Sequence, residues 1–402
     1  MVWPTLSMVV AVYVARLIYH AYFSPLASIP GPFLNKISNL PLNYQLIRGQ
    51  FHTYSVKLHA DTSDTRMVLA THAFRKGRMY RRSAATDVTQ HVTTTLPEVN
   101  KARRRMLGDA FAAHTMRAVE NLVVDAGASA LITAWDSEIA KQGQVARVNY
   151  YYAFHRMAVD VIGAVAFGSS FNILKTRNAD IIDWLHDTAM KVVSETGLPP
   201  RIDVLQSQGL TPPQLESELI LMLVAGSDTT GSTLTWIVMN LLHNPECYKR
   251  LPYLSAVIYE SMRITSPSAT MLTRNVPAEG VTIQGFFIPT GSQICLSFGA
   301  CHHNPRLWKN PGVFDPERFL GPDSTKRISD VLTFSTGVRV CIGRNLAMLD
   351  IFTALANILR RYDFKLPDDA VRGIPVEVPG LSYLVTGPVN PKNNCWVNIS
   401  LA

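Results

Sequence analysis

The chain has 402 residues, of which 47% are hydrophobic and 17% charged, so it can bury a large core and lacks the composition of a disordered protein. Its five cysteines are odd in number and form no C-x-x-C pair, which argues against a disulfide framework and against a zinc cluster. The formal net charge of +8 would suit an anionic membrane or an acidic protein. No nucleic-acid-binding signature accompanies the basic runs, so we expect no nucleic-acid partner.

Residues 1–23 are almost entirely apolar and are predicted to form a membrane anchor helix. At about 1.5 Å per residue this helix is roughly 34 Å long, enough to cross a bilayer core if Arg16 reaches the headgroups. A secretory signal peptide fits less well because no basic region precedes the apolar run. A buried N-terminal helix is the remaining alternative. Residues 24–40 follow as a hinge stiffened by Pro30 and Pro32, and residues 41–402 form the predicted globular domain.

Two basic segments follow the hinge. The run from Arg75 to Arg82 is interpreted as a solvated face. The second segment contains Arg103, Arg104 and Arg105 next to an apolar face, and we expect Arg103 and Arg105 to face solvent. Periodicity and turn signals predict helices at residues 98–117, 119–141, 153–167, 178–195, 211–244, 254–264 and 344–362, and strands at 281–288 and 293–298.

The longest predicted helix, 211–244, begins at a clear signal and is interrupted at its centre. Thr211 is expected to cap its N-terminus, with Gln214 completing a capping box. Residues 225–230, AGSDTT, then place a carboxylate and hydroxyl groups among apolar turns. A solvent-facing polar stripe is the simpler explanation, but the flanking turns are apolar all round.

Each polar or small residue of this interruption needs a physical reason. A buried carboxylate at Asp228 is costly unless it is paired. Gly226 removes a side chain where a bulky group has to approach. Thr229 can donate to a carbonyl of the previous turn or turn its hydroxyl inward.

Glu260 and Arg263 lie three residues apart on one face of the helix predicted at 254–264. An isolated pair of this kind is usually surface decoration that contributes about a few tenths of a kcal/mol. A Pro-Glu-Arg-Phe segment that contains Arg318 follows some fifty residues later.

The segment from Phe334 to Asp350, FSTGVRVCIGRNLAMLD, places Cys341 on a tight loop before a predicted helix. The positive end of that helix should favour a thiolate, which is the form that binds a metal. Gly337 and Gly343 allow something flat to lie against the loop, and Arg339 is suited to bind a carboxylate. A buried structural cysteine is the alternative.

The order of residues in this loop resembles the haem-binding loop of the cytochrome P-450 family, where the Cys thiolate is the axial ligand of the haem iron. The central AGSDTT segment, the Glu-x-x-Arg pair with the later Pro-Glu-Arg-Phe, and the proline-rich hinge also resemble that family. The resemblance implies a mainly α fold with small β-sheets, in a shortened form with an N-terminal membrane helix. It also implies haem (iron protoporphyrin IX) as the cofactor.

The resemblance assigns roles residue by residue. Cys341 would be the metal ligand, and Asp228 and Thr229 would relay protons. Ala225 and the loop residues Ala269, Thr270 and Met271 would face substrate. The further residues that would bind haem are Phe334, Gly337, Arg339, Gly343, Arg104 and Arg274, and those of a buried structural network are Glu260, Arg263 and Arg318.

The implied activity is the insertion of one oxygen atom from O2 into an apolar small molecule. No G-x-G-x-x-G fingerprint is present, so electrons should come from a separate NADPH-dependent reductase. The segments SPLASIPGPF and FDPERFLGP most resemble the corresponding segments of enzymes of fungal secondary metabolism. The implied location is the endoplasmic reticulum membrane, with a single span and the catalytic domain facing the cytosol.

The sequence departs from the family pattern in three places. The usual strand pair is not recognisable between residues 51 and 97, too few residues lie between 196 and 211 to form the two roof helices, and a helical segment is missing between Arg250 and Leu251. A degenerate or truncated family member without catalytic activity is therefore the alternative to a monooxygenase. Rearrangement chemistry without net oxygenation is a third hypothesis.

Overall fold

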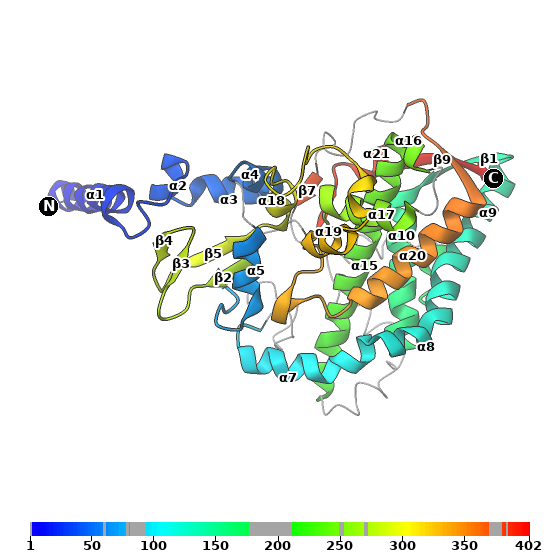
Figure 1. Cartoon of the computed structure of the whole chain (residues 1–402), viewed down its shortest axis with the longest axis horizontal. Coiled ribbons are helices and arrows are strands. Elements are labelled where there is room, and N and C mark those ends of the chain that lie inside the picture. Colours follow the sequence, from blue (N-terminus) through cyan, green and yellow to red (C-terminus); the bar gives the residue numbers. More distant parts are fainter. Residues whose placement is uncertain are drawn as a thin grey trace.

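The computed structural model describes residues 2–58, 62–77, 80, 94–176, 211–248, 253–268, 272–369, 380–382 and 385–402. The architecture is mainly helical, with small antiparallel sheets at the periphery (Figure 1). Its longest element is α15 (Pro212–His243), which packs against α10 (Tyr150–Ile162) and α20 (Arg344–Arg361). The predicted fold class is confirmed.

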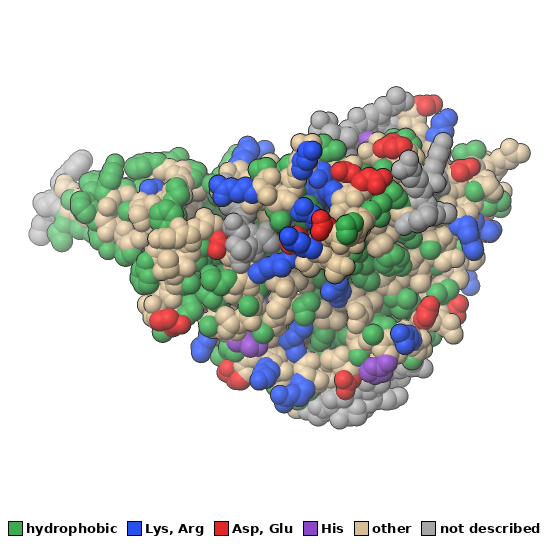
Figure 2. Space-filling view, in the orientation of Figure 1, with side chains coloured by type: hydrophobic (Ala, Val, Ile, Leu, Met, Phe, Trp, Pro, Cys, Tyr) green, Lys and Arg blue, Asp and Glu red, His purple; other side chains and the backbone are tan. Residues whose placement is uncertain are grey.

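The N-terminal helix projects from the body (Figure 1). It runs as α1 (Val2–Ile18) and continues in a π-helical turn, η1 (Tyr19–Phe23). By length and composition, residues 5–23 could cross a membrane. Most of the large apolar side chains of α1 are exposed, and Figure 2 shows hydrophobic side chains covering this end. The segment after it contains α2 (Phe33–Ile37), α3 (Leu40–Ile47), α4 (Phe51–Leu58) and α5 (Thr62–Ala70).

The helices predicted at 98–117 and 119–141 are present with a different break. The chain is extended at Ala112, whose φ is −68° and ψ 154°, so the first helix ends before it and a second begins after it. The second helix then continues, through a π-helical segment, to residue 142. The elements are α7 (Pro97–Gly108), η2 (Asp109–Phe111), α8 (Ala113–Val123), the π-helical η3 (Val124–Ser129) and α9 (Ala130–Gln142).

The main core lies between α10 and α15. Asn149 caps α10 by accepting a hydrogen bond from the Tyr152 backbone N–H at 3.3 Å, so the helix starts three residues before the predicted position. Phe154 and Met157 of α10 and Trp236 of α15 are buried there. The helix continues as η4 (Gly163–Phe167), and α11 (Ile173–Thr176) follows.

The predicted capping box of α15 is confirmed at Thr211 and Gln214. The helix predicted at 254–264 is confirmed as α17 (Leu254–Ile264), and the last predicted helix ends one residue early, as α20. The helix predicted at 178–195 lies outside the described residues. The other short helices are α16 (Pro245–Tyr248), α18 (Phe298–His302), η6 (Pro316–Phe319), α19 (Ser324–Asp330), η7 (Gly337–Arg339) and α21 (Pro391–Asn394).

All described sheets are antiparallel and small. One has three strands in the order β1 (Val145–Asn149), β9 (Trp396–Leu401), β6 (Tyr362–Lys365). The others are pairs: β2 (Leu272–Asn275) with β5 (Gln293–Leu296), β3 (Val281–Ile283) with β4 (Phe286–Ile288), and β7 (Gly380–Ser382) with β8 (Thr386–Pro388).

The single strand predicted at 281–288 is wrong, because this segment is a hairpin. Gln284 and Gly285 have φ values of 50° and 82°, which is the left-handed conformation that two-residue hairpin turns require. Because the residues on both sides of the turn are largely apolar, the sequence pattern did not indicate that the chain reverses direction here.

A buried carboxyl group of α20 faces η3. Asp350 is 3% exposed, and its Oδ1 has no hydrogen-bond partner among the described residues. Oδ1 faces Gly127 of η3, where a Cβ would lie 3.4 Å away from it. Burial raises the pKa of Asp350 to about 7.

We predict that Asp350→Asn changes how stability depends on pH. The folded state holds the Asp350 proton more tightly than the unfolded state, so the wild type loses stability as pH rises from the ordinary pKa of 3.8 to about 7. At about 1.4 kcal/mol per pKa unit this loss is a few kcal/mol. The thermal midpoint of the variant minus that of the wild type, followed by circular dichroism, should therefore increase by several degrees between pH 5.5 and 8. The exposed Asp363→Asn is the control, and a pH-independent difference would contradict the prediction.

Candidate functional site

The loop that contains Cys341 is held by its own backbone and by α5. The Cys341 N–H donates to the Phe334 carbonyl at 2.7 Å, and the Gly343 N–H donates to the Cys341 sulfur. Gly337 has a φ of +61°, and a Cβ there would lie 2.5 Å from the Leu69 carbonyl oxygen. Gly337 is therefore required by the contact with the end of α5, whereas a Cβ on Gly343 would meet no protein atom within 4 Å.

The sulfur of Cys341 is exposed, yet protein surrounds it closely. Burial raises the pKa of the thiol, and this effect outweighs the Gly343 N–H and the charges of Arg104 and Arg344, which lower it. The expected effect of the helix N-terminus is present, but burial has the larger influence on the thiol pKa. A bound cation would have to supply the remaining stabilisation of the anion.

Basic side chains from four segments converge near the loop. Arg104 of α7 and Arg274 of β2 are close enough to Arg339 of η7 for their charges to affect its pKa. Lys76 is held beside them by a backbone β-bridge to Arg274. Burial and the charges of Arg274 and Arg104 lower the pKa of Arg339 to about 10. Burial and the charges of Arg339, Arg274 and Arg104 lower the pKa of Lys76 to about 6. We call these four residues the cation cluster.

The cation cluster has donors that the described protein does not satisfy. The Arg339 Nε and Nη1 and the Arg274 Nε are buried without a hydrogen-bond partner. Arg274 Nη1 donates to the Tyr80 hydroxyl at 3.0 Å. Buried charges of one sign with free N–H groups fit an anion, and guanidinium forks suit carboxylates. The two propionates of a haem whose iron is held by Cys341 fit this arrangement.

Lys76 was missed in the sequence and Arg103 was misplaced. Lys76 lies in the run interpreted as solvated, but it is 6% exposed, and its backbone forms an isolated β-bridge with Arg274 of a distant segment. Only the apolar Phe74, two residues earlier, hinted at burial. Arg103 is 7% exposed instead of solvated, whereas Arg105 is exposed as expected.

The polar interruption of α15 has two different faces. Ala225 is exposed and Thr229 half-buried, although the turns that follow are buried, and the Thr229 hydroxyl donates to the Ala225 carbonyl at 2.6 Å. Gly226 faces α10 instead, because a Cβ there would lie 2.6 Å from Ile162 Cδ1. The bulky group that Gly226 accommodates is therefore a side chain of this protein.

Asp228 is half-buried and has a titratable partner. Its Oδ1 lies 3.3 Å from Nε2 of His155, which projects from α10. The sequence analysis missed His155, since nothing near it in the sequence points to a residue seventy positions away. The available signal was a lone polar ring on an apolar helix face.

The structure brings Glu260, Arg263 and Arg318 together. Arg263 donates from Nε and Nη2 to both Glu260 oxygens at 2.7 Å, and Arg318 Nε lies 3.4 Å from Glu260 Oε1. Glu260 and Arg263 are fully buried, and Arg263 also donates to the carbonyls of His302 and Pro311. This network ties α17 to the segment that leads to the Cys341 loop.

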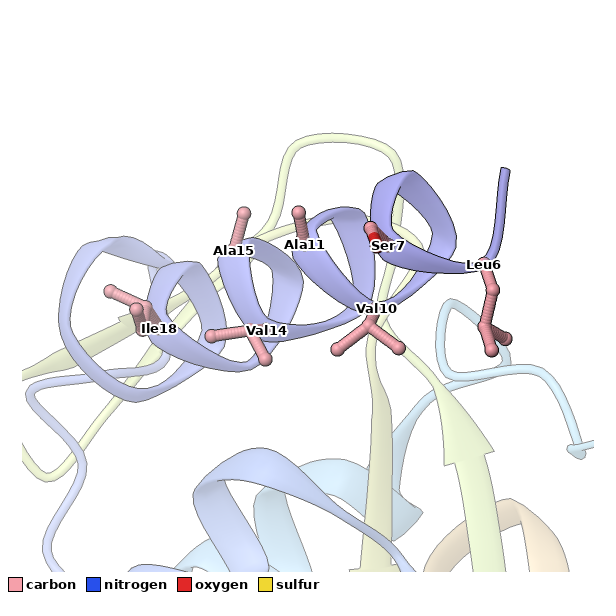
Figure 3. Close-up of a pocket in the computed structure, with 7 residues that line it drawn as sticks. All are labelled: Leu6, Ser7, Val10, Ala11, Val14, Ala15 and Ile18. Atoms are coloured by element: carbon pink, nitrogen blue, oxygen red, sulfur yellow. The ribbon is translucent and has the colours of Figure 1, made fainter. Parts of the chain in front are cut away.

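The predicted substrate loop and a groove on α1 are two further features of the chain. The predicted substrate residues Ala269, Thr270 and Met271 lie outside the described residues. A shallow groove runs along α1, with Ser7, Ala11 and Ala15 on one side and larger apolar side chains on the other (Figure 3). It lies on the projecting helix and contains none of the site residues.

Comparisons with known proteins agree with this site. The sequence profile of the family described as "Cytochrome P450" matches residues 46–205, 202–251 and 246–388. The cytochrome P450 monooxygenase helB1 of Aspergillus fumigatus is 27% identical over 499 aligned positions, covering 98% of this chain and 86% of the relative. The cytochrome P450 monooxygenase FUS8 of Gibberella moniliformis is 25% identical, covering 85% of this chain and 84% of the relative. The crystal structure of the cytochrome P450DA heme domain has a TM-score of 0.68 at 19% identity and covers 84% of this chain and 85% of that chain, which is a likeness of fold.

The same comparisons bear on the shortened segments. The matched parts of the profile meet at residues 202–205 and 246–251, where the sequence was expected to lack helical segments. The alignment with helB1 has 499 positions and this chain has 402 residues, so the relative has residues where this chain has none.

We predict that Glu260→Gln strongly destabilises the protein, because it leaves the Arg263 charge buried without an anion. Breaking a buried pair in this way costs about 3–5 kcal/mol. Glu138→Gln is the matched control, since Glu138 and Lys141 form a pair with the same spacing at 3.3 Å in which Glu138 is half-buried and Lys141 exposed. The loss of this pair should cost under about 1 kcal/mol. Thermal midpoints and soluble yield measure the difference. Equal midpoints for the two variants would contradict the prediction.

Proposed function

The chain belongs to the cytochrome P450 family and is a P450 monooxygenase, and we propose that it inserts one oxygen atom from O2 into an apolar small molecule of fungal secondary metabolism. The observation that carries this proposal is the placement of an exposed Cys341 sulfur beside the cation cluster. One end of this arrangement suits an iron ion and the other suits carboxylates.

We assign haem binding to the residues around this sulfur. Cys341 would ligate the iron, while Arg104, Arg274 and Arg339 would neutralise the propionates, with Lys76 as a fourth cation. Phe334 accepts the hydrogen bond that fixes the Cys341 backbone, and Gly337 and Gly343 shape the loop. When bound, haem with a thiolate ligand supplies the electron density that favours cleavage of the O–O bond.

Two residues of α15 would deliver the protons that the reaction consumes. Asp228 holds a carboxyl group that can give up a proton, and Thr229 places a hydroxyl on the exposed side of the helix. The Thr229 hydroxyl donates to the Ala225 carbonyl, so its oxygen remains available to accept a hydrogen bond from a water or a substrate. Positioned groups of this kind act as general acids.

The partners follow from the family and from the charge of the chain. Electrons would come from a separate NADPH-dependent reductase, and the net charge of +8 suits an acidic partner. Residues 1–23 would anchor the protein in the endoplasmic reticulum membrane, with residues 24–40 as the hinge and residues 41–402 facing the cytosol. The exposed apolar side chains of α1 support this anchor.

The assignment to fungal secondary metabolism rests on two observations. The segments SPLASIPGPF and FDPERFLGP resemble enzymes of that class. Relatives that cover most of the chain come from Aspergillus, Fusarium and Gibberella. Within this class, a terpenoid, a polyketide, an alkaloid or an aromatic acid would fit as substrate.

An inactive family member is the second candidate. It is favoured by the missing positions relative to helB1 and by the breaks in the profile match at residues 202–205 and 246–251. It is opposed by the presence of every residue of the Cys341 loop, the α15 interruption and the Glu260 network. Loading with haem separates the two candidates.

We predict that the reduced, purified protein under carbon monoxide gives the Soret band of thiolate-ligated haem. Cys341→Ser should abolish this band, because the serine hydroxyl does not replace the thiolate. Cys247→Ser is the control, since Cys247 is half-buried on another part of the chain. Protein that folds but binds no haem would favour the inactive candidate.

We also predict that Arg104→Gln lowers haem content about ten-fold at limiting haem, since a hydrogen bond to a charged group contributes about 1.5–3 kcal/mol. Arg105→Gln is the matched control, because Arg105 is the next residue of α7 and is exposed. Haem absorbance per protein after gel filtration measures the effect. The assignment of Arg104 is wrong if both variants retain equal haem.

A further inference from the structure

The imidazole of His155 is held in one orientation on α10. It is 3% exposed, and its Nδ1 lies 2.8 Å from the Tyr151 carbonyl oxygen, four residues earlier. A carbonyl only accepts hydrogen bonds, so Nδ1 must carry a hydrogen. The ring also packs on the Tyr151 ring, tilted by 35°, with centroids 4.0 Å apart.

With Nδ1 occupied, the other nitrogen is directed toward the central helix. Nε2 lies 3.3 Å from Asp228 Oδ1 and 3.4 Å from the Ser232 hydroxyl. A neutral ring accepts a hydrogen bond at Nε2 from a protonated Asp228, and an imidazolium donates one to the carboxylate. In both states the pair holds one proton between Nε2 and Oδ1.

The central helix is shaped to receive this ring. Gly231 of α15 lies against His155, and a Cβ there would be 2.7 Å from the ring Cγ. Any larger residue would displace the imidazole from Asp228. The contact therefore depends on two positions of α15 as well as on His155.

We propose that His155 is a positioning residue for Asp228, which fixes the carboxyl group and shares with it the proton that Asp228 delivers. This inference rests on the proposed role of Asp228 as a proton donor. In the imidazolium state the shared proton moves from Nε2 to Oδ1, and the carboxyl group then gives it up, which leaves a neutral imidazole and a carboxylate. Solvent returns the proton to the pair through the Asp228 side chain, which is 23% exposed.

His155→Gln tests this proposal, because a glutamine side chain can donate to Asp228 but holds no exchangeable proton of this kind. His155→Phe is the second variant, since it keeps the ring in the same space without nitrogen atoms. His243→Gln is the matched control. The His243 Nδ1 lies 2.7 Å from the Met239 carbonyl oxygen, the same local contact, at a site distant along α15 from Asp228.

The first measurement is a double-mutant cycle on the thermal midpoint of the haem-loaded full-length protein. The shifts caused by His155→Gln and Asp228→Asn should be non-additive, whereas those of His243→Gln and Asp228→Asn should add. Additive shifts for the first pair would overturn the proposal. Should His155→Gln fail to fold, the cycle is measured with His155→Phe.

The second measurement uses NADPH, a purified reductase and O2, and follows NADPH consumption and hydrogen peroxide release from pH 6 to 8.5. Positioned acids typically accelerate proton transfer by about 100-fold or more. His155→Gln and Asp228→Asn should therefore each lower the rate of NADPH consumption by about ten-fold and alter the pH profile of this rate. The double variant should add nothing further, and His243→Gln should match the wild type.

The outcomes separate this inference from the proposed function. An effect of Asp228→Asn without an effect of His155→Gln or His155→Phe would overturn the role of His155 and leave Asp228 as the donor. No effect of Asp228→Asn would overturn the role of Asp228, and the inference with it. A haem-free protein would be recognised beforehand by its carbon monoxide spectrum.

Discussion

The concentration of positive charge beside Cys341 is the constraint on which the rest of the site depends. Lys76, Arg104, Arg274 and Arg339 come from segments far apart in the sequence. The charges of Arg104 and Arg274 help to lower the pKa of Arg339, and those of all three arginines help to lower the pKa of Lys76. Buried charges of one sign destabilise the folded state unless an anion lies among their donors. An anionic cofactor would stabilise the folded state by binding it alone, so folding and loading are linked by mass action. Binding of the cofactor would therefore stabilise the fold around the Cys341 sulfur.

A second charged network holds the frame of this site at a distance. Glu260 joins α17 to the segment before the Cys341 loop, and Arg263 is surrounded by carbonyl oxygens of that segment. Because both charges are fully buried, neither tolerates the loss of the other. On the proposed function the two networks have different roles. The cation cluster would bind the anionic groups of the cofactor, and the Glu260 network holds the segment that leads to the Cys341 loop.

Local signals in the sequence predicted much of the helical frame, while contacts between distant segments could not be predicted. The capping box at Thr211 and the limits of α17 follow from neighbouring residues, and the order of residues around Cys341 indicated the cofactor. Lys76 and His155 were missed because their burial comes from partners elsewhere in the chain. For the thiol at Cys341, the sequence indicated the contribution of the helix N-terminus but not that of burial, which depends on the whole fold and outweighs it.

The two glycines of α15 that face α10 have a mechanical consequence. Gly226 lies against Ile162 and Gly231 against His155, in both cases closer than a methyl group allows. The interlocked side chains oppose sliding and rotation of one helix along the other, as close-packed interiors generally do. The two helices therefore move as one rigid unit, and adjustment to substrates of different shape has to occur in the segments that surround them.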